Sequence, residues 1–238
     1  MRNCLIMGSG RSGTSMMAGV LAKSGYFMGR NLIPPRPANP KGFFESSQIN
    51  RDINEVLIRS KISNLTPGHG WIAVSSLIPP KGNPIVRRRV INMVTREPFC
   101  YKDPRFCYTL PFWKPSLKNT NFICVFRHPA STATSIVKEC KTAKYLKNTR
   151  MDIGRAFQIW MTMYKLILDK LSKSGTWMFV SYDQLFDKES LDKVQSFLDL
   201  STIDHSFPEK RFVRPVPNIK TPPVALAMYA QLCRMANQ

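Results

Sequence analysis

The stretch NCLIMGSGRSGTS, residues 3–15, is the segment from which the fold is predicted. Its apolar run from Cys4 to Met7 is continuous rather than alternating, which is typical of a parallel strand buried on both faces. Gly8 then opens a glycine- and serine-rich turn, and residues 16–24 follow as a helix that Gly25 would end. A loop between a strand and a helix N-terminus directs backbone N–H groups at one point, so the segment is predicted to bind an anion.

Later segments repeat the alternation of strands and helices. Strands are expected at residues 99–102, 121–126 and 176–181. The helix expected before the last strand ends at Gly175, and its apolar face comprises Ile153, Phe157, Trp160, Met161, Tyr164 and Leu168. This order predicts an α/β fold, a three-layer sandwich with a mainly parallel central sheet. A length of 238 residues suits a single domain over residues 1–238.

The composition narrows the class of partner without choosing one. The formal net charge is +20, from 35 Lys and Arg against 15 Asp and Glu, so partners should be anionic: a nucleic acid, an acidic polymer or a polyanionic cofactor. The six cysteines are scattered without metal-ligand spacing, which predicts reduced thiols, a cytoplasmic location and no metal site. Apolar runs are too short for a signal peptide or a membrane span.

The glycine-rich loop departs from the loop of nucleotide triphosphatases at one informative position. Its glycines and Ser15 fit G-x-x-x-x-G-K-[ST], but Thr14 stands where the lysine that reaches a γ-phosphate belongs. The strand at 121–126 ends in Arg127, where a kinase would carry an acidic ligand for Mg²⁺. The sequence therefore predicts a site that binds an anion directly, without metal.

These residues resemble the sulfotransferase family that uses 3′-phosphoadenosine 5′-phosphosulfate (PAPS). The family motif [KR]-S-G-T-[ST] matches residues 11–15, and its strand-ending arginine followed eight residues later by serine matches Arg127 and Ser135. The resemblance implies that the first element holds the 5′-phosphosulfate and the second holds the 3′-phosphate, with Tyr182 near the base. The implied donor-binding residues are Gly10, Arg11, Ser12, Gly13, Thr14, Ser15, Arg127, Ser135 and Tyr182.

Three more segments are similar to the bacterial-type branch of this family. They are NPKGFFE at 39–45, KDPR at 102–105 and VSYDQL at 180–185, the last followed by an expected short helix at 191–200. The resemblance covers residues 3–200 and implies a P-loop-like sulfotransferase fold. It also implies in-line transfer of a sulfuryl group from PAPS to a hydroxyl or amine, without metal, with adenosine 3′,5′-bisphosphate as the second product.

The resemblance also implies the residues that carry the chemistry. Glu45 is the expected general base, while Arg11 and Lys102 are the expected cations near the departing phosphate. Phe43 and Phe44 are expected to desolvate Glu45 and raise its pKa. His69, in an irregular segment at 66–84, is the rival base, because a flexible loop flanked by glycines could bring it over the acceptor. No histidine lies near KDPR, where cytosolic members of the family carry a catalytic one.

Several interpretations remain open at this stage. A P-loop small-molecule kinase and a non-catalytic nucleic-acid binding protein are the alternatives, although nucleic acid is the less expected partner because the aromatic residues follow core periodicity. Asp103 is expected to pair with Arg105 or Lys102. The basic residues at 87–89 and 210–220 would imply an acidic acceptor such as a charged glycan if they line the cleft, and otherwise a small-molecule acceptor remains open.

Overall fold

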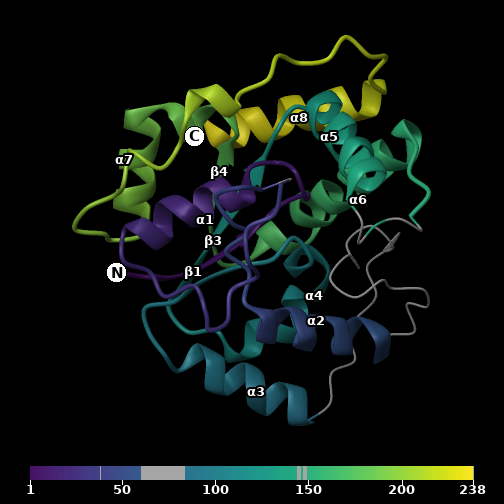
Figure 1. Ribbon diagram of the computed structural model, residues 1–238. Helices are drawn as coiled ribbons and strands as arrows, with labels where there is room; N and C mark the ends of the chain where they lie inside the picture. The colour runs from purple at the N-terminus through teal and green to yellow at the C-terminus, as the bar shows by residue number, and fades with distance from the viewer. Residues whose placement is uncertain (38, 60–83, 144–145, 147–148, 238) are drawn as a thin grey trace.

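A four-stranded parallel sheet forms the centre of the protein (Figure 1). The computed structural model describes residues 1–37, 39–59, 84–143, 146 and 149–237. The strands are β1 Asn3–Met7, β2 Cys100–Lys102, β3 Thr120–Phe126 and β4 Thr176–Ser181, in the spatial order β2-β1-β3-β4. Since β1 has later strands on both sides, the chain reverses its direction of winding there, and ligands of open parallel sheets bind at such points.

Helices cover both faces of this sheet. Their bounds are α1 Thr14–Lys23, α2 Ser47–Arg59, α3 Pro84–Val94, α4 Phe106–Trp113, α5 Pro129–Thr142, α6 Ile153–Asp169, α7 Lys188–Phe197 and α8 Pro223–Ala236. In Figure 1, α8 lies above the sheet in the view and α3 lies below it, at opposite ends of the molecule.

Alternate side chains of the strands enter two separate cores. In β1, Cys4 and Ile6 pack with α1 and α7, whereas Leu5 and Met7 pack with the remaining helices. All four side chains have no exposed surface, as a continuous apolar strand between two helix layers requires. The predicted three-layer α/β sandwich with a parallel sheet is confirmed.

The predicted elements differ from the structure mainly at their ends. The helix expected at 191–200 is α7, which begins three residues earlier because the Asp187 carboxylate accepts a hydrogen bond from the Ser190 N–H and caps its first turn. In α6, Ile153 was wrongly placed on the buried face: it is 41% exposed, since the first turn projects past the core. Among the described helices, none has the length and apolar character needed to cross a bilayer.

Candidate active site

The glycine-rich loop is fixed against β3 and α6. Gly8 lies so close to β3 that an added Cβ would be 2.1 Å from the Val125 carbonyl oxygen. The Tyr164 hydroxyl accepts a hydrogen bond from the Ser9 N–H at 3.2 Å and donates one to the Val125 carbonyl at 2.8 Å. Ser12 is fully buried beneath the loop, where its hydroxyl lies 3.3 Å from that of Thr132. The loop is therefore positioned by packing before any ligand binds.

Gly13 carries the loop into α1 and leaves the helix N-terminus open. It is the N-cap residue of α1, with φ 96°, so no N-cap side chain covers the amides of the first turn. An added Cβ here would lie 2.7 Å from Cδ2 of Tyr182. Thr14 and Ser15 begin the helix, where backbone N–H groups and the helix dipole favour an anion.

Arg127 and Tyr182 form a stacked pair beside this helix N-terminus. Arg127 follows β3 and Tyr182 follows β4, and the guanidinium carbon lies 4.1 Å from the centre of the tyrosine ring. The pair is anchored by the backbone, because the Tyr182 N–H donates to the Phe126 carbonyl at 2.7 Å and Trp160 Nε1 donates to the Arg127 carbonyl at 3.2 Å. Burial lowers the pKa of the Arg127 guanidinium below its ordinary value.

Arg11 turns toward α5. Its backbone is in the left-handed region, with φ 69°, and its Nε donates to the Ser135 hydroxyl at 3.1 Å. The same Nε lies 3.5 Å from Glu139 Oε2. Glu139 was not predicted from the sequence, although its spacing of four residues from Ser135 on a helix indicates a shared face.

Lys102, at the carboxyl end of β2, forms a buried ion pair with Glu45. The two side chains are 1% and 12% exposed, and Lys102 Nζ donates to Glu45 Oε1 and, at 3.2 Å, to the Ser15 hydroxyl. Burial raises the pKa of Glu45 above its ordinary value, and the charge on Lys102 opposes that shift. This is the direction predicted from the sequence. Phe44, one of the two rings next to Glu45 in the sequence, packs edge-on against Phe207 with ring centres 5.6 Å apart.

Asp103 and Arg105 form a second buried pair below the site. Arg105 Nε and Nη2 donate to the two carboxylate oxygens of Asp103 at 2.9 and 2.6 Å, and Nη1 donates to Asn54 Oδ1 at 2.5 Å. Both charged side chains are 1% exposed. Pairing of Asp103 with Arg105 is confirmed, and its alternative pairing with Lys102 is wrong because Lys102 bonds to Glu45 instead.

Most of the predicted donor-binding residues line one cavity of 390 Å³. They are Arg11, Gly13, Thr14, Ser15, Arg127, Ser135 and Tyr182. The residues at the strand end and those at the helix N-terminus therefore line the same cavity. Gly10 lines a neighbouring cavity of 60 Å³ together with Glu45 and Lys102.

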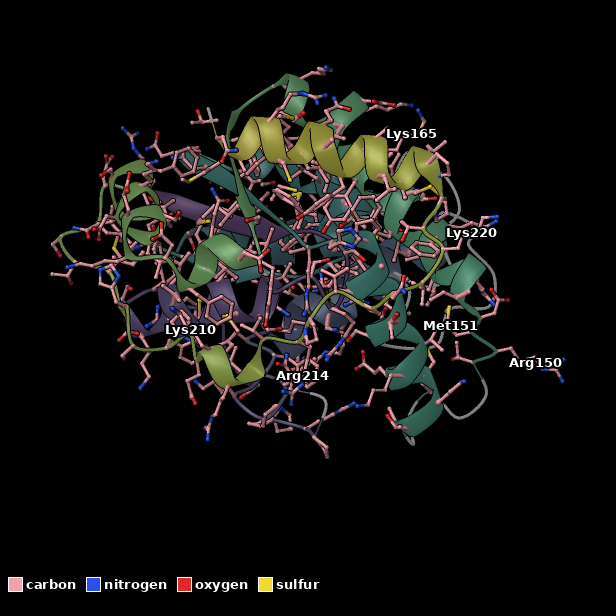
Figure 2. All side chains as sticks on the ribbon, turned by 90° about the horizontal axis from the view of Figure 1, so that it is seen from above. Arg150, Met151, Lys165, Lys210, Arg214 and Lys220 are labelled. Atoms are coloured by element: carbon pink, nitrogen blue, oxygen red, sulfur yellow. The ribbon has the colours of Figure 1, made fainter. Side chains whose placement is uncertain are left out.

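The 390 Å³ cavity is also lined by two cationic side chains that were not among the predicted donor-binding residues. Arg214, which lies between α7 and α8 (Figure 2), and Lys41, in the NPKGFFE segment, both line it. Lys41 also bonds to Glu209 at 2.5 Å. Arg214 belongs to a basic run in the sequence, but nothing in that run distinguishes it from its neighbours.

Neither His69 nor His128 is placed by the structure in the role of a base. His69, the rival base, lies outside the described residues. His128 uses Nδ1 to accept the Ala130 N–H at 3.2 Å and so caps α5. Among the described residues there is no cluster of three or more side chains suited to hold a metal ion.

Comparison with known proteins identifies the fold. No protein-family model and no curated protein sequence matches the chain. Among solved structures, the sulfotransferase domain from the Synechococcus PCC 7002 olefin synthase is 18% identical with a TM-score of 0.57, covering 99% of this chain and 94% of that one. The sulfotransferase domain from the curacin biosynthetic pathway is 16% identical with a TM-score of 0.56, covering 98% of both chains. The fold is that of a sulfotransferase domain. The predicted P-loop-like sulfotransferase fold is thereby confirmed.

Proposed function

We propose that this protein transfers a sulfuryl group from PAPS to a hydroxyl or amine of an acceptor, releasing adenosine 3′,5′-bisphosphate. The observation that carries the proposal is the 390 Å³ cavity in which an open helix N-terminus and Arg127 with Ser135 face one space. PAPS has two anionic ends joined by one ribose, so a cavity with two separate sets of anion-binding groups suits it.

Each part of the donor has a matching group in this cavity. The phosphosulfate would lie at the amides of Thr14 and Ser15, as anions do at helix N-termini. Arg127 and Ser135 would hold the 3′-phosphate, joined by Arg214 from the far side. The Tyr182 ring would lie against the base.

The transfer step needs charge stabilisation and a proton acceptor. As the acceptor oxygen bonds to sulfur, the bond from sulfur to the bridging oxygen breaks, and its electron pair passes to the departing 5′-phosphate. Lys102, which donates to the Ser15 hydroxyl, is placed to stabilise that charge. Glu45 receives the proton of the acceptor hydroxyl, and a pKa raised by burial makes it a better base.

Two residues of the site argue against the alternative of a P-loop kinase. Thr14 replaces the lysine that a γ-phosphate requires, and Arg127 stands at the strand end where a Mg²⁺ ligand is needed. The folds found in comparison are sulfotransferase domains.

The proposal is tested by ligand-induced stabilisation. At a hundredfold excess over Kd, adenosine 3′,5′-bisphosphate should add about 2.7 kcal/mol of stability. Since about 1 kcal/mol shifts Tm by roughly 2–4 °C for a chain of this size, Tm should rise by about 5–11 °C in the presence of EDTA. Adenosine should give no comparable shift. If ATP with Mg²⁺ stabilises the protein and the bisphosphate does not, the sulfotransferase assignment is wrong and the kinase alternative is supported.

A further inference from the structure

Three cavities meet at Arg11. This side chain lines the 390 Å³ cavity, the 60 Å³ cavity at Glu45, and a third cavity of 550 Å³ between α5 and the segment at 214–217. The cavity at Glu45 has room for only a few atoms, so an acceptor that reaches it must lie mostly elsewhere. Glu139 lines both the small cavity and the third one, so the third cavity adjoins the transfer point.

The third cavity has hydroxyl and charged groups along its α5 wall. From α5 it receives hydroxyl groups, including those of Ser131, Thr134 and Thr142. Prolines such as Pro215 and Pro217 also line it, and its described lining residues include no aromatic or aliphatic side chain apart from proline. A phenol or a steroid would therefore find no aromatic side chain to stack on among these residues, whereas a hydroxyl-rich molecule would find hydrogen-bonding partners.

Positive charge exceeds negative charge in this cavity. Four cations line it against one carboxylate, that of Glu139, whose charge is offset by Arg11 at 3.5 Å. Under the proposed donor binding, Arg127 and Arg214 serve the nucleotide. Lys138 lines the third cavity and not the nucleotide cavity, so its charge remains for the acceptor.

The positive charge continues outside the cavity. Figure 2 shows Lys210 and Lys220 on either side of Arg214, along the exposed segment that leads to α8. An elongated anion that extended from the third cavity along this segment would therefore meet further cations.

We propose that the third cavity binds the acceptor and that the acceptor is an acidic carbohydrate, a chain of hydroxyl-bearing sugars that carry carboxylates. This inference rests on the proposed sulfuryl transfer. The hydroxyl-rich wall fits sugar hydroxyls, and Lys138 fits a carboxylate. The bases of a nucleic acid, or the tyrosine of an acidic peptide, would be expected to stack on aromatic side chains, and the described lining has none.

The test compares two acceptors that differ only in charge. Calorimetry of the full chain, saturated with adenosine 3′,5′-bisphosphate, would measure binding of an oligosaccharide of alternating glucuronic acid and N-acetylglucosamine. The matched ligand is the same oligosaccharide with its carboxylates reduced to alcohols. The acidic form should bind and the reduced form should bind at least about tenfold more weakly, because charge-assisted hydrogen bonds to Lys138 are lost.

The matched protein variants are Lys138→Glu and Lys141→Glu. Both lysines are exposed on α5, but Lys141 does not line the cavity. Lys138→Glu should weaken the acidic oligosaccharide about tenfold, whereas Lys141→Glu should leave its affinity unchanged. Bisphosphate binding should be unaffected in both, which keeps this test separate from that of the proposed function.

Three outcomes would overturn the inference. The first is equal binding of the acidic and reduced oligosaccharides, and the second is equal loss in the two variants. The third is binding of a tyrosine-containing acidic peptide with no binding of either oligosaccharide. If the bisphosphate itself fails to bind, the proposed function fails instead.

Discussion

Replacement of Gly13 by alanine tests how the loop, Tyr182 and Arg127 depend on one another. The residue has φ 96°, and a left-handed backbone costs a non-glycine residue about 1–2 kcal/mol. The new Cβ would also lie 2.7 Å from Tyr182 Cδ2 and 3.2 Å from Leu185 Cδ1, and such overpacking costs about 1–3 kcal/mol. The two costs together lower the free energy of unfolding by about 2–5 kcal/mol.

Gly13→Ala should also weaken binding of adenosine 3′,5′-bisphosphate, because the Tyr182 ring cannot move without disturbing Arg127. Their 4.1 Å stacking means that relief of the clash shifts the guanidinium proposed to hold the 3′-phosphate. We expect the Kd for adenosine 3′,5′-bisphosphate to rise at least about tenfold, or about 1.4 kcal/mol, by calorimetry.

Gly25→Ala is the matched control. Gly25 has φ 97°, nearly the same as Gly13, but a Cβ there meets nothing within 4 Å. Urea denaturation should therefore show only the backbone cost of about 1–2 kcal/mol, with unchanged bisphosphate affinity. Equal destabilisation of the two variants, or normal bisphosphate binding by Gly13→Ala, would refute the coupling of loop and ring.

Three other changes have defined outcomes. Arg127→Ala should weaken adenosine 3′,5′-bisphosphate by about 1.5–3 kcal/mol in calorimetry, and adenosine 5′-phosphate far less, since only the former carries a 3′-phosphate; equal losses would contradict its role. Lys102→Met removes the charge that opposes the raised pKa of Glu45, so the folded state favours protonated Glu45 more strongly. Protonation of Glu45 then stabilises the folded state. This contribution is fully present below pH 4.5, the ordinary pKa of Glu45, and is lost as the pH rises through the higher pKa that Glu45 has in the folded protein. In urea denaturation at several pH values, the free energy of unfolding of Lys102→Met should fall further below that of the unchanged protein as the pH rises above 4.5. A difference that does not change with pH would exclude coupling between Lys102 and Glu45. Asp103→Asn leaves the Arg105 guanidinium buried without its counter-ion and should cost about 3–5 kcal/mol, most of which the double variant Asp103→Asn, Arg105→Met should restore.

The sequence predicts the sheet well because its strands contain short continuous apolar runs, and the side chains of β1, β2 and most of β3 are buried. A strand such as β4, predicted at 176–181, must be a short apolar run between polar turns, and its bounds match the structure. Helix ends are harder to predict, since they depend on single side chains. The start of α7 is set by the Asp187 cap, and the apolar pattern of the helix contains no sign of it.

Site residues could be predicted where a motif lies on one continuous element. Thr14 and Ser15 follow a strand and a short glycine-rich loop, so their place at a helix N-terminus is already defined locally. Contacts between segments far apart in the sequence could not be predicted from motifs. Phe44 packs against Phe207, which lies more than a hundred and sixty residues later in the sequence. The side chain of Arg11, in the glycine-rich loop, turns to Glu139 on α5. Such pairings depend on tertiary packing, which short-range patterns do not contain.

The arrangement of the strands explains how the site gathers its charge. Each parallel strand brings one component of the site to its carboxyl end: β1 the loop that ends at Gly13, β2 Lys102, β3 Arg127 and β4 Tyr182. Because parallel strands all end at the same edge of the sheet, four segments far apart in the sequence meet there. Lys102 and Arg127 thus come from strand ends, whereas a nucleotide triphosphatase takes its lysine from the loop itself. The register of the sheet, from Ile6 beside Lys102 to Phe126 beside Ser181, therefore sets the distances between the groups proposed to bind the donor.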